Sequence, residues 1–132
     1  MTDWKKAIVS GDAPLSESIR RIDSGGCQLA VVLDGEGKLA GLLSDGDVRR
    51  AILRGCDLKT PTSEVMNRNP TTAPVTTTKE DLLALMRRKV LRQIPLVNEQ
   101  GVVAGLATVD NLAGVVERAD DDLAQRLVVL GE

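Results

Sequence analysis

The chain has 132 residues, which is enough for one compact domain and too short for two full-sized catalytic domains. Its 17 Lys and Arg against 19 Asp and Glu give a formal charge of −2, so the main driving force for nonspecific nucleic-acid binding is missing. With no His, Phe or Tyr and a single Trp, the chain lacks imidazole chemistry, His metal ligands, base-stacking platforms and the aromatic belts of membrane proteins.

The cysteines and the apolar runs point to neither a metal site nor a membrane. Cys27 and Cys56 lack CxxC spacing, which predicts two reduced thiols and no zinc or redox motif. No apolar run approaches about 18 residues, and the N-terminal segment lacks the long apolar stretch of a secretory signal. We therefore expect a cytoplasmic protein with no metal and no membrane or nucleic-acid partner.

The first half of the chain predicts five elements in the order β-α-β-β-α. They are an extended segment at 7–10, a helix after Pro14, two apolar strands at 29–33 and 39–43 joined by a turn, and a helix capped by Ser44. The apolar residues that share a helix face are Leu15, Ile19 and Ile22 in the first helix and Val48, Ala51 and Ile52 in the second.

The second half repeats this order at an offset of 64 residues. Residues 30–52 align without a gap on residues 94–116, and apolar, turn and hydroxyl positions agree in kind. Thr78 begins a helix and Thr108 caps another, as Ser44 does in the first copy. The apolar residues of the helix after Thr78 are Leu82, Leu83, Met86 and Val90.

These elements define the expected domain organisation. The first repeat covers residues 1–58, a connector 59–62 and the second repeat 63–118, with a short lead-in helix at 62–67. Residues 119–132 form either a last helix or the start of a following domain. The fold class is α/β (α+β), and because a unit of about 55 residues is marginal alone, we expect the repeats to pack with pseudo-twofold symmetry around a cleft.

The segment GLLSDGD, residues 41–47, is the most informative for chemistry. Gly41 lets the backbone come close to a ligand, Ser44 offers a hydroxyl at a helix start, and the Asp47 carboxylate can accept two hydrogen bonds from a ribose diol. A ribose phosphate fits this set. The spacing also fits a purely structural interpretation, in which Ser44 caps the helix and Asp47 complements its dipole.

Two other motifs are set aside. Gly35, Gly37 and Gly41 mimic a dinucleotide fingerprint, but they lie between two strands rather than between a strand and a helix. Asp45-Gly46-Asp47 resembles a metal-binding DxD, yet the sequence places no third carboxylate beside it.

The tandem pattern resembles a pair of cystathionine-β-synthase-type (CBS) domains, a Bateman module, over residues 4 to about 117. The residues that carry the likeness are Gly41-Leu42-Leu43-Ser44, Gly105-Leu106-Ala107-Thr108 and Ile94-Pro95-Leu96-Val97. The segments TDWKKAI, SDGDVRRAIL, SEVMNRNP and ALMRRKVLRQIPLV are most similar to the CBS pair fused ahead of a sugar-phosphate nucleotidyltransferase domain.

This resemblance implies a regulatory module, not an enzyme, that binds an adenosine nucleotide such as AMP, ADP or ATP and needs no cofactor. It implies one cleft lined by Ser44 and Asp47 of one repeat with Thr71, Thr72, Ala73, Gln93, Ile94 and Pro95 of the other. Our candidates for neutralising the phosphate are Arg50 and Arg92, which also fit ordinary solvated charges. The mirror cleft pairs Thr108 and Asn111 with Ile8, Val9, Gln28, Leu29 and Ala30.

The mirror cleft departs from the family pattern, because Asn111 replaces the acid. A hydrogen bond to a charged group contributes about 1.5 to 3 kcal/mol and a neutral one about 0.5 to 1.5, so this cleft is expected to bind on the order of tenfold more weakly. Asp110 could substitute if the helix register shifted by one residue.

The resemblance leaves a second function open, a structural dimerisation domain with vacant clefts. Members of the family commonly pair through apolar helix faces, so a homodimer is expected under both functions. A nucleotidyltransferase is the expected attached or partner enzyme.

Overall fold

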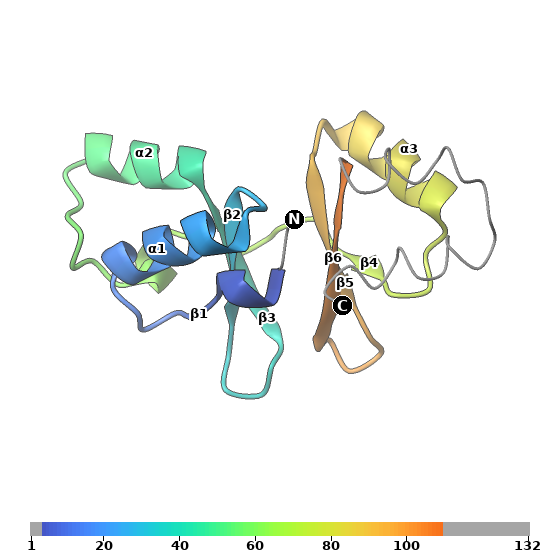
Figure 1. Cartoon of the computed structure of the whole chain (residues 1–132), viewed down its shortest axis with the longest axis horizontal. Coiled ribbons are helices and arrows are strands. Elements are labelled where there is room, and N and C mark those ends of the chain that lie inside the picture. The colour runs from blue at the N-terminus through green and yellow to red at the C-terminus, as the bar shows by residue number, and fades with distance from the viewer. Residues whose placement is uncertain (1–3, 110–132) are drawn as a thin grey trace. The chain divides into compact units, whose positions relative to one another are not determined.

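The computed structural model describes residues 4–109 of the chain (Figure 1). They belong to two compact units, the first ending at Pro70 and the second beginning at Thr71. The predictions for Asp110, Asn111 and the C-terminal segment lie outside the described residues.

The first unit is a three-stranded sheet with two α-helices. Its elements are η1 (Trp4–Ala7), β1 (Ile8–Ser10), α1 (Leu15–Gly25), β2 (Leu29–Leu33), β3 (Leu39–Ser44), α2 (Asp45–Leu53) and η2 (Thr62–Glu64), where η denotes a 3-10 helix. The strand order is β1-β2-β3, with β1 parallel to β2 and β2 antiparallel to β3. The predicted β-α-β-β-α order is therefore confirmed for the first repeat.

The second unit repeats this topology as far as it is described. Its elements are β4 (Ala73–Pro74), α3 (Lys79–Lys89), β5 (Gln93–Val97) and β6 (Val103–Thr108), in the strand order β4-β5-β6. Leu29 pairs with Ser44 in the first hairpin, and Gln93 pairs with Thr108 in the second. Both hairpins also shift register at equivalent places, after Val32 and after Leu96. The 64-residue offset inferred from the sequence therefore holds in the hydrogen-bond register, and the fold is a mixed α+β fold of two repeats.

Each unit has its own apolar core. The first contains Leu15 and Ile22 of α1, Ala30 and Val32 of β2, and Leu43 of β3, with other residues. The second contains Ala73, Leu82, Met86, Ile94, Leu96 and Ala107. Since side chains alternate along a strand, Leu29 and Val31 belong to the opposite face of the first sheet and Pro95 to that of the second. Each sheet is therefore apolar on both faces.

Two helix-face predictions are wrong. Ile52 is 49% exposed, so the buried face of α2 is narrower than the spacing indicated. Helix α3 ends at Lys89, and Val90 follows as its C-cap in the left-handed region with φ 56° and ψ 53°. This backbone turn carries Val90 out of the helix face, and its side chain is 89% exposed.

The segment that follows Pro61 packs on the first unit. The Thr62 hydroxyl donates to the Ala13 carbonyl at 2.9 Å and also hydrogen-bonds the Ser18 hydroxyl, and both hydroxyl residues are fully buried. Val65 and Met66 join the first core. Residues 63–70, expected to open the second repeat, therefore lie in the first compact unit, and the predicted helix at 62–67 is reduced to the three residues of η2.

Candidate functional site

The predicted hydroxyl and carboxylate meet where β3 ends and α2 begins. Ser44 is the N-cap of α2, and the Asp47 amide donates to its hydroxyl at 3.2 Å. In return, the Ser44 amide and hydroxyl both donate to Asp47 Oδ2, at 2.9 and 3.0 Å. These contacts form a complete capping box, which satisfies two of the free amides at the helix start. The helix cap predicted at Ser44 is confirmed.

The second oxygen of Asp47 belongs to an ion pair. Arg50 Nη2 donates to Asp47 Oδ1 at 2.9 Å, one turn along α2. The Asp47 side chain is 21% exposed and that of Arg50 is 61% exposed. The guanidinium lies against the backbone of Gly46, where an added Cβ would sit 3.2 to 3.5 Å from its atoms. Ser44, Asp47 and Arg50 thus form one connected polar group, which we call the α2 triad.

Gly46→Ala is expected to stabilise the chain by about 0.5 to 1 kcal/mol, because alanine loses less conformational freedom in a helix than glycine does. The three nearest atoms to the new Cβ belong to the Arg50 guanidinium, the far end of a flexible side chain that can move aside. A urea titration would measure the change. A loss of stability would mean that the contact between Arg50 and Gly46 contributes more than helix propensity does.

Gly41 provides a close approach to the chain's own backbone. A Cβ at this position would lie 2.7 Å from both the Asn67 carbonyl oxygen and Met66 Sδ. The same place carries two backbone hydrogen bonds, from the Leu42 amide to the Asn67 carbonyl and from the Asn67 amide to the Leu42 carbonyl. The close approach at Gly41 is therefore made by the segment 66–67, which it holds against β3, and the approach to a ligand expected at Gly41 stays a prediction.

The residues predicted to complement Asp47 come together in the second unit. Ala73 of β4 pairs with Leu96 of the parallel strand β5. The segment before β4, with Thr71 and Thr72, therefore lies beside the start of β5, with Gln93, Ile94 and Pro95. Ala73, Ile94 and Pro95 are buried, and Thr72 is exposed.

Arg92 leads into β5, and its carbonyl accepts a hydrogen bond from the Val109 amide at 2.9 Å. It also borders an apolar pocket on the second unit. The described lining residues of this pocket are Leu83, Met86, Arg87, Val90, Leu91, Arg92 and Val109.

The first-repeat residues predicted for the mirror site lie on the neighbouring strands β1 and β2 or, for Gln28, just before β2. Ile8 of β1 pairs with Val31 of β2, two residues beyond Leu29. Gln28, just before β2, has a φ of 70°, which is uncommon for a residue other than glycine. Thr108 ends β6 and is buried, and its predicted partner Asn111 lies beyond the described residues.

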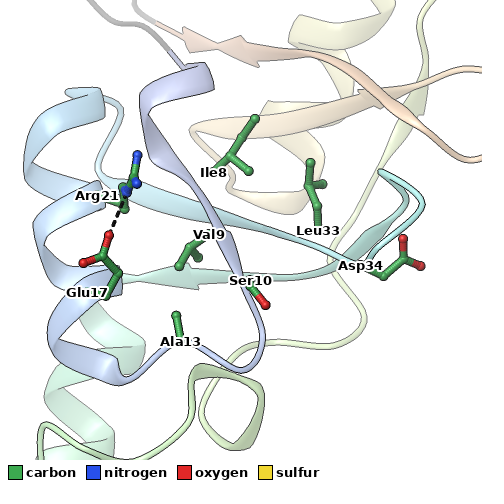
Figure 2. A pocket seen from close by; sticks show the side chains of 8 residues that line it. All are labelled: Ile8, Val9, Ser10, Ala13, Glu17, Arg21, Leu33 and Asp34. Carbon is green, nitrogen blue, oxygen red and sulfur yellow. Dashed lines mark hydrogen bonds and ion pairs between the residues drawn. The ribbon is translucent and has the colours of Figure 1, made fainter.

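Figure 2 shows a pocket of about 430 Å³ beside β1, which is an edge strand of the first sheet. It is lined by Ile8, Val9, Ser10, Ala13, Glu17, Arg21, Leu33 and Asp34. On the α1 side of the pocket, Arg21 Nε donates to Glu17 Oε2 at 3.0 Å, and this hydrogen bond lowers the pKa of the Glu17 carboxyl. The i, i+4 spacing of Glu17 and Arg21 was a readable sequence signal for the ion pair. Nothing in the sequence indicated that this ion pair would line the same pocket as Ile8 and Val9.

The described range holds neither a candidate metal cluster nor a candidate membrane span. Within residues 4–109, no three His, Cys, Asp or Glu residues gather as a group that could hold a metal ion. In the same range, no helix has the length and apolar character needed to cross a bilayer.

A match to a known family model shows the family of this chain. The model of the family described as "CBS domain" matches residues 3–54 and 63–118, which is most of the chain in two tandem copies. The chain belongs to the CBS domain family.

The curated relatives of this CBS pair are longer proteins. Arabinose 5-phosphate isomerase KpsF of Escherichia coli is 32% identical over 99 residues, which cover 74% of this chain and 30% of the isomerase. The CBS pair spans a third or less of the length of the curated relatives it matches.

Solved CBS structures share the fold. The CBS domain protein PAE2072 of Pyrobaculum aerophilum, complexed with AMP, superposes with a TM-score of 0.72 at 21% identity, covering 90% of this chain and 98% of that one. The cytosolic domain of the Mg2+ channel MgtE, in complex with ATP, gives a TM-score of 0.70 at 25% identity over 83% of this chain and 44% of that one.

Proposed function

We propose that this CBS pair is a regulatory module that binds an adenosine nucleotide and has no catalytic activity of its own. The observation that carries the proposal is the α2 triad, which presents a carboxylate, a hydroxyl and a cation at one helix start. Carboxylates recognise ribose hydroxyls, and hydroxyls, cations and helix starts recognise phosphate. The AMP and ATP bound by two related folds support adenosine nucleotides as the ligand class.

The stronger proposed site combines the α2 triad with residues of the second repeat. Ser44, Asp47 and Arg50 would contact ribose and phosphate. Thr71, Thr72, Ala73, Arg92, Gln93, Ile94 and Pro95 would complete the site around base and phosphate. Gly41 supports the site indirectly, because it anchors β3 to the segment 66–67. The apolar second face of each sheet supports an association of the two repeats, since such faces need covering.

The weaker proposed site combines Thr108 and Asn111 with residues of the first repeat, which are Ile8, Val9, Gln28, Leu29 and Ala30. A neutral amide at Asn111 is expected to make it weak or empty. The pocket beside β1 borders Ile8 and Val9, which adds Ser10 and Arg21 as neighbouring polar groups.

The regulated enzyme is proposed by chemical class. One curated relative is an arabinose 5-phosphate isomerase, and the resemblance in the sequence points to a sugar-phosphate nucleotidyltransferase. Both classes act on phosphorylated sugars, so we propose an attached or partner enzyme of sugar-phosphate metabolism. The cytoplasmic location and the homodimer expected from the sequence stay predictions.

Two observations favour the second function, a structural dimerisation domain with vacant clefts. The α2 triad satisfies its own hydrogen bonds, so its geometry does not require a ligand. Ile52, Leu53 and Leu58 also leave apolar surface exposed near the end of α2, which suits a dimer contact.

Thermal unfolding in the presence of nucleotides separates the two functions. A ligand at 100 times its Kd adds about 2.7 kcal/mol of stability, which shifts Tm by several degrees. We expect AMP, ADP or ATP to raise Tm in a saturable way, and GMP at the same concentration to raise it less. A Tm unmoved by millimolar adenosine nucleotides would favour the structural function.

A further inference from the structure

The two oxygens of Asp47 have different partners. Oδ2 accepts from both the amide and the hydroxyl of Ser44, contacts that also hold the helix cap together. Oδ1 accepts from the Arg50 guanidinium. A ribose diol that approaches Asp47 therefore meets Oδ1 as the oxygen outside the capping box, and Arg50 is already bound to it.

The contact at Oδ1 is the one that can be exchanged. The Arg50 side chain is 61% exposed, and the pair spans one turn of a helix surface. Exposed ion pairs of this kind contribute little to stability, because water competes for both partners and the long side chain loses freedom in the pair. The Ser44 contacts are part-buried and close a capping box, so breaking them would also uncap α2.

A displaced Arg50 guanidinium stays close to the site. Its Cα lies one turn into α2, and its side chain lies across Gly46, where the absence of a Cβ leaves room for the guanidinium. Gly46 and Asp47 are the second and third residues of that helix, so the cation can turn from the carboxylate to an anion held beside the helix start. Arginine binds phosphate oxygens through paired donors as well as it binds carboxylates.

We propose that Arg50 makes the site selective for phosphorylated nucleotides over nucleosides, by exchanging Asp47 for the ligand phosphate. This inference rests on the proposed nucleotide binding. When both ribose hydroxyls donate to Oδ1, they occupy both of its lone pairs, so the ion pair between Arg50 and Asp47 breaks. A phosphate on the ligand gives the guanidinium a new partner, whereas a nucleoside leaves it without one. Breaking the ion pair therefore lowers the affinity for adenosine. It does not lower the affinity for AMP, because the phosphate replaces the lost partner of Arg50.

The test compares AMP and adenosine on the full chain and on Arg50→Ala, with adenosine measured by competition against AMP. Loss of a hydrogen bond to a charged phosphate lowers affinity by about tenfold or more, so AMP affinity should fall by that factor. Adenosine should bind Arg50→Ala at least as well as the wild type, and up to about fivefold better if the lost surface pair opposed it.

Arg49→Ala is the matched control, because it removes the same charge from the neighbouring exposed position of α2. It should leave the ratio of AMP to adenosine affinity within about twofold of the wild type if surface charge alone contributes little. Arg50→Lys keeps the charge without the paired donors and should give an intermediate ratio.

The outcomes separate this inference from the proposed function. A wild-type chain that binds neither AMP nor adenosine overturns both. If the wild type binds AMP but Arg50→Ala lowers the affinities for AMP and adenosine in parallel, the selectivity role of Arg50 is overturned. The same holds if Arg50→Ala leaves AMP affinity unchanged. In both cases the proposed nucleotide binding still holds. If the ratio of AMP to adenosine affinity falls equally in Arg49→Ala, the effect comes from general surface charge, and this also overturns the selectivity role of Arg50.

Discussion

Asp47→Ala is expected to lower the affinity of the chain for AMP by at least about tenfold, because the ribose loses a charged hydrogen-bond acceptor. The same change removes the acceptor of the Ser44 amide and hydroxyl, so a loss of about 0.5 to 2 kcal/mol of stability should accompany it. Calorimetric titration with AMP measures the first effect and urea unfolding the second.

Asp45→Ala is the matched control for Asp47. It removes the same charge from the first turn of α2, at an exposed position that no capping contact of Ser44 uses. AMP affinity should stay close to that of the wild type. If Asp45→Ala weakens AMP as much as Asp47→Ala does, the effect belongs to the general charge of the helix start and the assigned role of Asp47 is wrong.

Asn111→Ala tests which of the two proposed sites dominates. Most of the AMP affinity should survive this change, because an amide at that position makes a weaker site than the carboxylate of Asp47. If Asn111→Ala strongly lowers AMP affinity and Asp47→Ala retains it, the assignment of the stronger and the weaker site would be reversed.

Gly41→Ala should destabilise the first unit by about 1 to 3 kcal/mol, the usual cost of forcing extra atoms into a packed site. Its Cβ would lie 2.7 Å from the Asn67 carbonyl oxygen and from Met66 Sδ, and 2.9 Å from Met66 Cγ. The methionine side chain can shift, but the carbonyl belongs to the backbone that pairs with Leu42. Relief of the clash therefore has to strain or break that pairing.

Fluorescence of Trp4, the only tryptophan of the chain, reports this unfolding, since its side chain is 5% exposed in the first unit. Gly35→Ala is the control, because nothing lies within 4 Å of its added Cβ. In a Met66→Ala background, Gly41→Ala should cost less than it does in the wild type, as two of the three atoms nearest to the new Cβ are gone. Equal stability of Gly41→Ala and Gly35→Ala would contradict the packing role of Gly41.

The strands and the repeat were predictable because their signals are local. The apolar run at 29–33 and the turn after it set β2 and the hairpin, and the aligned second copy supplied an independent instance of the same pattern. The capping box at Ser44 was equally local, since three residues separate its two members.

The errors arose where distant contacts or backbone conformation decide the outcome. Val90 continues the helical spacing of Met86, and no Gly or Asn marks the end of α3, yet the chain turns there and the Leu91 amide bonds the Met86 carbonyl. The helix expected at 62–67 is reduced to three residues, in a segment where the Thr62 hydroxyl hydrogen-bonds the carbonyl of Ala13, 49 positions earlier in the chain. Neither contact is accompanied by a periodic pattern of residues from which it could have been predicted.

The chemistry of the site was partly predictable. The sequence indicated that Ser44 and Asp47 share a helix start, but it offered Arg50 only as one of two candidate cations. The ion pair at 2.9 Å and the fit of the guanidinium against Gly46 depend on rotamers, which spacing does not specify.

Calorimetric titration of the wild-type chain with AMP tests the central claim most directly. We predict saturable binding with one dominant site per chain, whose affinity falls by at least about tenfold when Asp47 is replaced by alanine. Absence of any saturable heat at millimolar AMP, ADP and ATP, in a chain whose unfolding is cooperative, would contradict the account and leave structural association as the function of the module.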